Sequence, residues 1–321
     1  MGRYVSRQLA SIIPTILLSI VINFILLHAA PGDPARIMAG MDNPNPAQIE
    51  AIRQQLGLDR PLPVQFWNYV KELAQGNLGQ SIAFKQPVFD LIMDRMPATL
   101  MLTVTSAVLA LVIGTLLGAV AAQRSQSSFD NVVSFGNYTL FAVPSFWLGL
   151  IMIVIFSSKL GWLPTSGMRN VRADYTGWRD QLDVIEHMIL PVVTLALVQI
   201  PIYFRITRAS VLQQQREDYV TTFRATGIPE KKIFQRYALR NALLPTVTVF
   251  GLSLGFVFTG AALIEIVFAW PGIGRLTLDA VFRRDYPLLL GVYLILAIAI
   301  SIAVLITDVV YALLDPRIRL H

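Results

Sequence analysis

Long runs without a charged residue dominate this chain of 321 residues. A helix needs about 20 apolar residues to cross the hydrocarbon core of a membrane. Six runs reach or approach that length, and they are residues 9–30, 98–122, 131–158, 188–204, 241–264 and 288–307. The shortest run, 188–204, is expected to extend past Arg205. The pattern predicts an all-α polytopic membrane protein with six transmembrane helices.

The charges between these runs predict the orientation. Six spans put both termini on the same side. If that side is the cytoplasm, and if Glu265 and Asp308 at the ends of two runs are counted separately, the cytoplasmic segments carry 13 Lys/Arg and five Asp/Glu, whereas the outer segments carry 13 of each. Basic segments are retained on the cytoplasmic side, so the sequence predicts an N-in/C-in topology. The net charge of +6 is explained by this topology, and a nucleic-acid partner is not expected.

The first apolar run could also be read as a signal peptide, because Arg3 and Arg7 precede it. The run is longer than the apolar region of most signal peptides, and His28 fits poorly with a cleavage site of small residues. A retained first span is therefore expected. The chain then divides into a tail with the first transmembrane helix (1–30), an extracytoplasmic loop with short helices (31–97) and a core domain with five transmembrane helices (98–321).

The outer loop 31–97 contains two stretches with helical spacing. Residues 47–56 end at Gly57, and residues 64–73 carry the aromatic side chains Phe66, Trp67 and Tyr69. The loop could form a rim around an entrance or a simple cap over the helix bundle.

The sequence offers no site for catalysis. A nucleotide-binding P-loop needs Gly-Lys-Ser/Thr, and none of the five lysines precedes Ser or Thr. The three histidines are scattered and cysteine is absent. We expect a chain that is not an enzyme and holds no metal or cofactor, and a membrane-bound hydrolase is not expected.

Residues 205–240 form the most charged stretch between two apolar runs, with eight Lys/Arg and three Asp/Glu in 36 residues. Glu217 and Asp218 favour the start of a short helix, and Gly227 can end it in a left-handed conformation. A second helix is predicted after Pro229. Its apolar face is formed by Ile233, Phe234, Tyr237 and Ala238. The short helix could dock on another protein or rest at the bilayer interface.

Six motifs in this chain together resemble one family. They are EDYVTTFRATG (217–227) followed by LRNALLPTVT (239–248), Pro31-Gly32-Asp33-Pro34, QLGLDRPLPVQFWNYV (55–70), FAWPGIG (268–274), RDYP (284–287) and DPRIR (315–319). In order and spacing they are similar to the permeases of ABC importers of the dipeptide/oligopeptide/nickel branch. The resemblance covers nearly the whole chain and points to the permease subunit with the long first periplasmic loop.

This resemblance implies a type I ABC-importer permease fold in a bacterial inner membrane. It implies a coupling helix that docks on a separate ATPase, formed by Glu217, Asp218, Tyr219, Phe223, Ala225, Gly227 and Ile228. A candidate gate or pathway is predicted separately, from the ionisable Glu265 at the end of a span and the motif after it, at Glu265, Phe268, Trp270, Pro271, Gly272 and Gly274. The structural motif positions are Pro31, Gly32, Asp33, Pro34, Asp308, Pro316 and Arg317.

The resemblance also implies the partners. They are a homologous permease subunit in a heterodimer, two ABC ATPase subunits that bind ATP and Mg, an extracytoplasmic solute-binding protein and membrane lipid. Two residues depart from the family pattern: Phe223 stands where alanine is usual, and Thr226 where lysine is common. A phenylalanine there implies a reshaped cleft in the ATPase.

Several positions keep two interpretations at the level of sequence. Glu265 is either a polar contact in the pathway or a structural partner of a neighbouring helix, and Asp308 is expected to be structural. Pro144 and Pro191 are expected to kink their helices. Glycines 251, 255 and 260 are expected to allow close helix contact.

An ATP-independent secondary transporter or channel is the alternative function. It predicts an inverted repeat and polar residues near the middle of the membrane, and neither is evident. The solute is left open among dipeptides, oligopeptides, glutathione, nickel complexes and oligosaccharides.

Overall fold

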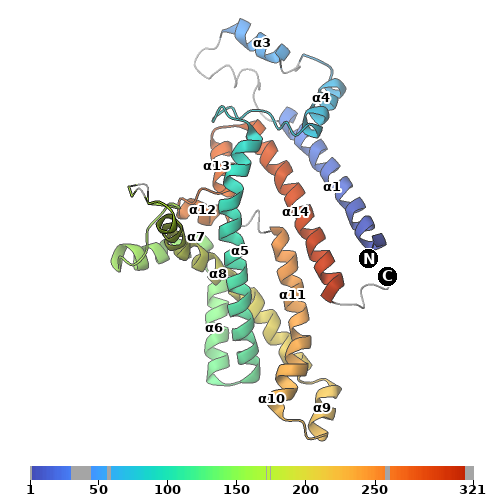
Figure 1. Cartoon of the computed structure of the whole chain (residues 1–321), viewed down its shortest axis with the longest axis vertical. Helices are drawn as coiled ribbons and strands as arrows, with labels where there is room; N and C mark the ends of the chain where they lie inside the picture. Colours follow the sequence, from blue (N-terminus) through green and yellow to red (C-terminus); the bar gives the residue numbers. More distant parts are fainter. Residues whose placement is uncertain are drawn as a thin grey trace. The chain divides into compact units, whose positions relative to one another are not determined.

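The computed structural model describes residues 2–29, 45–55, 59–170, 172, 173, 175–256 and 261–314. In this part of the chain the regular structure is helical, with an isolated antiparallel bridge between Gln80 and Pro87. Figure 1 shows the helices. Their bounds are α1 Gly2–Ala29, α3 Pro46–Gln55, α4 Leu62–Ala74, α5 Val88–Gln123, α6 Ser128–Ala142, α7 Ser145–Met152, η1 Ile153–Lys159, α8 Trp178–Gln214, α9 Asp218–Ala225, α10 Glu230–Lys232, η2 Ile233–Ala238, α11 Leu239–Phe256, α12 Ala262–Val267, α13 Ile273–Phe282 and α14 Tyr286–Leu314.

Three of the described helices are long and apolar enough to cross a membrane. They are α5, α8 and the first 20 residues of α14. A fourth crossing is possible if α6 and the following α7–η1 segment count as one bent span. The described apolar stretch of α1 is shorter, Ile13–Leu26. The chain is therefore an all-helical polytopic membrane protein, which confirms the predicted class.

The third expected span, 131–158, is not one kinked helix. Helix α6 and the α7–η1 segment meet at an angle of 106°. Val143 and Pro144 between them have extended backbone, with ψ angles of 127° and 133°. Proline lacks an N–H and disfavours helical geometry in the residue before it. Pro144 therefore breaks this run, whereas Pro191 lies inside the continuous helix α8.

Two other expected spans also differ from their helices. Helix α8 extends past Arg205 to Gln214, as predicted, but it also begins at Trp178, within the expected outer loop. The expected fifth span, 241–264, corresponds in its described part to two helices, α11 and α12. The segment after it, residues 265–287 between the fifth and sixth apolar runs, contains the ten-residue helix α13.

The described chain separates into two compact units. The first contains residues 1–97 and 276–301. In it, α4 packs on α1 through aromatic rings, because Phe66 and Tyr69 lie 5.1 and 6.0 Å from Phe24. Asn23 of α1 donates a hydrogen bond to the carbonyl of Leu290 in α14 at 3.1 Å. Trp67 is 69% exposed, so it does not contribute to this packing.

The second unit contains residues 98–275 and 302–321. Its helices α5 and α8 cross closely at two glycines. A Cβ atom on Gly114 would lie 2.8 Å from the carbonyl oxygen of Ile200, and one on Gly118 would lie 2.7 Å from that of Phe204. Gly114 and Gly118 form a GxxxG pattern, which favours close packing of membrane helices. The sequence analysis did not single it out.

The expected close contact at Gly251 is present in the same unit. Thr307 of α14 lies against Gly251 of α11 and donates a hydrogen bond to its carbonyl at 2.8 Å. Several predicted positions fall outside the described residues, namely Pro31, Gly32, Asp33, Pro34, Leu56, Gly57, Gly260, Pro316 and Arg317. Asp308 lies in α14, but its side chain is outside the described part, as is the packing of Gly255.

Candidate functional site: the coupling segment and the outer turn

Residues 217–228, here called the coupling segment, form a helix that is closed at its end by main-chain bonds. Helix α9 runs from Asp218 to Ala225, and Gly227 follows with φ +79°. The N–H of Gly227 donates to the carbonyl of Arg224 at 3.0 Å, and the N–H of Ile228 donates to that of Phe223 at 3.1 Å. This bond pair defines a Schellman motif. The predicted left-handed end at Gly227 is confirmed.

The helix predicted after Pro229 begins at Glu230, also as predicted. It passes through a π-helical segment, η2, before it continues as α11. The expected apolar face is present, because Ile233 and Ala238 are buried and Phe234 and Tyr237 are half-buried.

Phe223 packs within its own chain. Its ring centroid lies 4.4 Å from that of Tyr237 in η2 and 5.9 Å from that of Tyr219 one turn earlier in α9. Such ring pairs contribute about 1 kcal/mol beyond their buried area. The sequence analysis assigned the bulk of Phe223 to a reshaped cleft in the ATPase. The structure shows a cause within the chain, because the ring fastens α9 to η2.

An ion pair makes a second link across the turn at Gly227. The Arg224 guanidinium donates to the Glu230 carboxylate at 2.5 Å. This hydrogen bond lowers the pKa of Glu230 and raises the pKa of Arg224. The pair stabilises the turn above the ordinary carboxyl pKa of Glu230, and the contribution is lost as the pH falls through its lowered pKa. Both groups are exposed, so salt screens the pair.

The opposite face of α9 is free in this chain. Glu217, Asp218, Thr221, Thr222 and Ala225 are exposed, whereas Val220 is buried. Tyr219 is half-buried and donates to the side chain of Gln214 at 2.8 Å. The coupling segment is thus a short helix held from behind, with small and polar side chains on its outer face.

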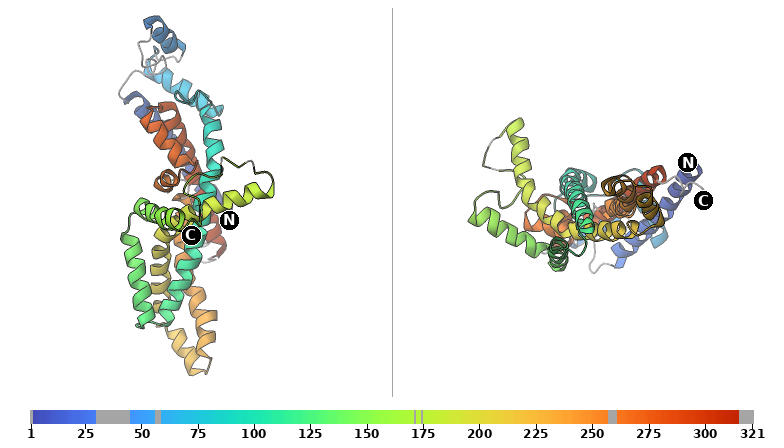
Figure 2. Two further views of the ribbon diagram at one scale, coloured as in Figure 1. Left: turned by 90° about the vertical axis from the view of Figure 1, so that its left-hand side faces the viewer. Right: turned by 90° about the horizontal axis from the view of Figure 1, so that it is seen from below.

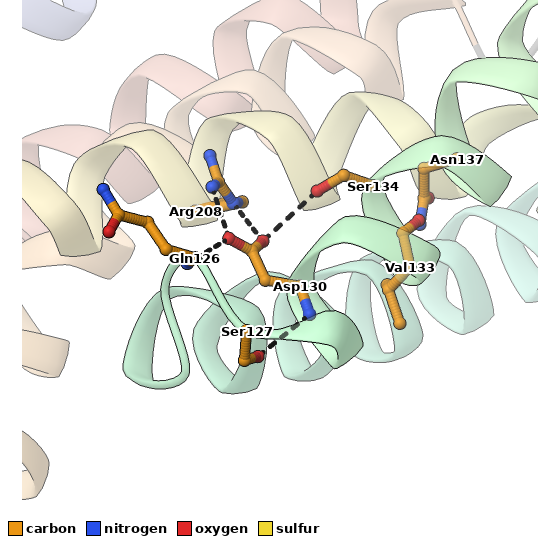
Figure 3. Close-up of polar contacts among 7 residues, drawn as sticks. All are labelled: Gln126, Ser127, Asp130, Val133, Ser134, Asn137 and Arg208. Atoms are coloured by element: carbon orange, nitrogen blue, oxygen red, sulfur yellow. Dashed lines mark hydrogen bonds and ion pairs between the residues drawn. The ribbon is translucent and has the colours of Figure 1, made fainter.

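A buried ion pair lies at the end of α8 that leads to this segment. Asp130, at the start of α6, is 2% exposed and receives two hydrogen bonds from the Arg208 guanidinium, both 2.7 Å long. Its carboxylate also accepts the N–H of Gln126 at 3.0 Å and the hydroxyl of Ser134 at 3.3 Å. Figure 3 shows these contacts converging on Asp130.

The Asp130–Arg208 pair joins the α5–α6 turn to the end of α8. Arg208 also lines a cavity of about 530 Å³ that extends along α8 to Glu217 and Asp218. Sequence reasoning placed Asp130 in a cytoplasmic loop and missed this pair. The two residues are 78 positions apart, so no local pattern reveals their contact.

Residues 268–274, here called the outer turn, close over Glu265. Glu265 is fully buried and accepts the Thr99 hydroxyl at 2.7 Å and the N–H of Arg275 at 2.9 Å. Thr99 in turn accepts the N–H of Ile273 at 2.8 Å. The network connects α12, α5 and the start of α13, and it supports the structural interpretation of Glu265.

The other predicted gate residues also belong to this packed turn. Phe268 and Trp270 are buried, and the Trp270 indole N–H donates to the carbonyl of Ala98 at 2.8 Å. A Cβ on Gly272 would collide with the Glu265 carboxylate, and one on Gly274 would collide with Ala262. In the chain described here these residues build a core, and a role in gating remains a prediction.

The outer turn contains a strained position. Ala269 has φ +48° and follows α12 at the place where glycine usually stands. The N–H of Trp270 donates to the carbonyl of Glu265 at 2.7 Å, and the N–H of Ala269 donates to that of Ile266 at 3.1 Å. These bonds form a second Schellman motif, and the left-handed alanine costs about 1 kcal/mol.

Asp285, part of the RDYP motif, is a buried carboxylate in the first unit. It is fully buried and accepts the Ser81 hydroxyl at 2.5 Å and the N–H of Ala83 at 3.0 Å. It also accepts the N–H of Leu288 at 3.2 Å, as an N-cap of α14 does. Its role is to fasten residues 81–83 to the start of α14 in the first unit.

The structure therefore keeps the two candidate groups apart. The coupling segment follows the C-terminal end of α8, whereas the outer turn packs with Val184, Leu190 and Val192 near its N-terminal end. Figure 1 shows α9 and α10 beyond the ends of α8 and α11. Among the described residues, no group of His, Cys, Asp and Glu is arranged to hold a metal ion.

These features define a class: a helical membrane protein with an exposed short helix and a packed turn at opposite ends of one long helix. Residues 114–320 match the family described as binding-protein-dependent transport system inner membrane component. Residues 1–103 match the N-terminal family of such membrane components. The chain belongs to this family of transport subunits.

Curated relatives match over nearly their whole length. The chain is 38% identical to the di/tripeptide transport system permease protein DppB of Pseudomonas aeruginosa, with 98% of each covered. It is 38% identical to the oligopeptide transport system permease protein AppB of Bacillus subtilis, over 99% of this chain and 100% of the relative. It is 39% identical to the glutathione transport system permease protein GsiC of Escherichia coli K12, over 99% of each.

Family membership confirms the main functional prediction. The chain is a permease subunit of a bacterial ABC importer in the inner membrane, and it is a transport subunit without an ATPase site of its own. Such components work with separate ATPase and solute-binding partners. The matches favour this function over the alternative of an ATP-independent transporter.

Proposed function

We propose that this chain forms half of the pathway for short peptides, that it crosses the membrane six times with both termini in the cytoplasm, and that α9 transmits the movement of an ATPase. The proposal adds a homologous permease as the other half and two ATPase subunits that bind ATP and Mg. Peptides are favoured because two of the relatives are named for peptide transport and a third for glutathione, itself a peptide.

The fastening of α9 is the observation that carries the coupling role. A helix that transmits force must be held firmly to its own chain on one face and be accessible to a partner on the other. On the face toward η2, α9 is held by the Phe223–Tyr237 rings and the Arg224–Glu230 pair, and its end is closed by the Schellman motif. On the other face it exposes small and polar side chains that a cleft can surround. An ATPase dimer that closes on ATP would then move α9 and bias the permease pair toward the opposite opening.

Gly227 provides the test of this role. Its φ of +79° is strongly unfavourable for a β-branched residue, at a cost of about 1–2 kcal/mol. A Cβ added there meets no described atom within 4 Å, so Gly227→Val acts on the backbone and not through a clash. We expect Gly227→Val to insert into the membrane normally but to lose most peptide uptake while ATP hydrolysis by the complex continues.

Gly136→Val is the matched control. Gly136 lies inside α6, and a Cβ there likewise meets no described atom within 4 Å. This variant should keep uptake near the wild-type rate. The measurement is peptide uptake and ATP hydrolysis on the same proteoliposomes. A wild-type ratio of uptake to hydrolysis in Gly227→Val would contradict the role of α9.

A further inference from the structure

A second cavity, separate from the coupling segment, lies in the second unit between the loop after Lys159 and the first turns of α8. Its volume is about 930 Å³, within the range of small-ligand sites. Figure 2 shows the start of α8 projecting from the bundle of α5, α6 and α11. Nothing in the proposed function uses this cavity, which we call the α8 pocket.

The walls of the α8 pocket are fastened to each other. Asp183 of α8 is 8% exposed, and its carboxylate accepts the N–H of Asn170 in the loop at 2.7 Å. Further back, the N–H of Gly167 donates to the carbonyl of Phe268 in the outer turn at 2.8 Å. The loop is thus held at two points, and the pocket is formed without a ligand.

One wall of the pocket is a single face of α8. The lining residues on this helix are Arg179, Leu182, Asp183, Glu186 and His187, which have the i, i+3, i+4, i+7, i+8 spacing of one face. Arg179 and Glu186 stand at opposite ends of it. At 1.5 Å per residue, seven residues place them about 10 Å apart along the helix.

These two charges are uncommitted, as is that of Arg172 in the loop. Arg169 is paired with Asp180 at 3.3 Å, and Asp183 is engaged with Asn170. Across the described residues, the side chains of Arg179 and Glu186 have no ion pair or hydrogen bond, and both are exposed. The wall therefore offers a free cation and a free anion about two helical turns apart.

We propose that the α8 pocket binds a short peptide as a zwitterion, with its carboxylate on Arg179 and its ammonium group on Glu186. An extended chain spans about 3.5 Å per residue, so a separation of about 10 Å suits a peptide of about three residues. Arginine binds carboxylates through two parallel hydrogen bonds. Trp162 and Tyr175, which also line the pocket, offer rings to the peptide side chains. This inference rests on the proposed function and names where the solute meets this subunit.

The test is binding of trialanine to the purified complex of permeases and ATPases, with the solute-binding protein omitted. Trialanine is compared with its N-acetylated form and its C-amidated form. We expect each blocked peptide to bind at least about tenfold more weakly, because each loses one charge-assisted contact.

Two variants assign the contacts. Glu186→Gln should weaken trialanine about tenfold and leave the affinity for the N-acetylated peptide unchanged. Arg179→Gln should weaken the binding of trialanine about tenfold and leave the affinity for the C-amidated peptide unchanged. Lys159→Gln removes a nearby exposed charge that does not line the pocket, and it should bind like the wild type.

The outcomes separate this inference from the function on which it rests. The proposed role of the pocket would be overturned if the variants lost the same affinity for free and blocked peptides, or if both variants bound trialanine like the wild type. It would also be overturned if the complex imported trialanine with its binding protein but did not bind trialanine without it. In each of these cases the proposed function would stand. Absence of ATP-driven uptake of any peptide by the complete transporter would overturn both.

Discussion

Gly272 shows how tightly single residues are specified in the outer turn. A Cβ at this position would overlap the Glu265 carboxylate, which is fixed by Thr99 and by the N–H of Arg275. The carboxylate cannot retreat without breaking these bonds, and a buried group left without its bond costs about 1–3 kcal/mol. The smallest possible side chain should therefore disturb this turn.

We predict that Gly272→Ala destabilises the protein by about 2–3 kcal/mol. Thermal unfolding of the purified complex in detergent measures the change. Gly136→Ala, where a Cβ meets no described atom within 4 Å, is the control and should unfold at or above the wild-type temperature. Equal midpoints for Gly272→Ala and the wild type would contradict the packing described for Glu265.

The sequence identifies Glu265 as an unusual ionisable residue at the end of an apolar run, but it does not reveal the role of this residue. Both a gate and a structural contact are compatible with such a position. The deciding partner, Thr99, lies 166 positions away in α5. The same limit applies to Asp285, whose partner Ser81 is 204 positions distant.

At the scale of elements, the joint between α6 and α8 depends on the shape of one side chain. Arg208 contacts both oxygens of Asp130 with two nitrogens of a planar fork. Lysine would keep the charge but could not reproduce this geometry. Removing the fork leaves Asp130, 2% exposed, with fewer donors.

We predict that Arg208→Lys lowers stability by about 1–2 kcal/mol and reduces peptide uptake more than ATP hydrolysis. The reason is that α8 leads directly into the coupling segment, so a looser joint transmits less of the movement of α9. Arg216→Lys, at an exposed position on the same connection, should change neither quantity. Uptake and hydrolysis that fall together in Arg208→Lys would assign the pair a purely structural role.

The predictions of individual elements were correct where they depended on neighbouring residues in the sequence. The short helix α9, its end at Gly227 and the new helix after Pro229 depend on residues within about one helical turn of each other, and all three elements are confirmed. The 106° bend at Pro144 was foreseen only as a kink. Proline weakens a helix at that point, but the size of the bend depends on the packing of α7 and η1, which the local sequence does not contain.

At the scale of the whole molecule, topology is directly testable because the chain has no cysteine. Each introduced cysteine is therefore a unique label. We predict that Ala51→Cys, exposed in α3, reacts with an impermeant maleimide added to intact cells. Thr222→Cys, exposed in α9, should react only after the membrane is permeabilised. The opposite pattern would reverse the orientation that the basic segments predict.

The class of protein can be predicted from the sequence, since the uncharged runs, the unequal distribution of Lys/Arg between the two sides and the motifs each extend over nearly the full length. The detailed arrangement of the spans cannot be predicted in this way. Apolar runs mark residues that avoid water, but they do not distinguish a crossing helix from a packed turn such as α12 and residues 268–274. Helix α8 also exceeds its apolar run at both ends, because charged and polar residues such as Arg179 and Gln214 continue the helix.

Helix α8 is one continuous rod of 37 residues, about 55 Å long. Its first turns form a wall of the α8 pocket, and its last turns carry Arg208 and lead into α9. A rod of this length amplifies angle into distance: a tilt of about 5° at one end displaces the other by roughly 5 Å. On the proposed function, a small change of angle at the α8 pocket and a displacement of several ångströms at α9 are therefore the same rigid motion of one helix.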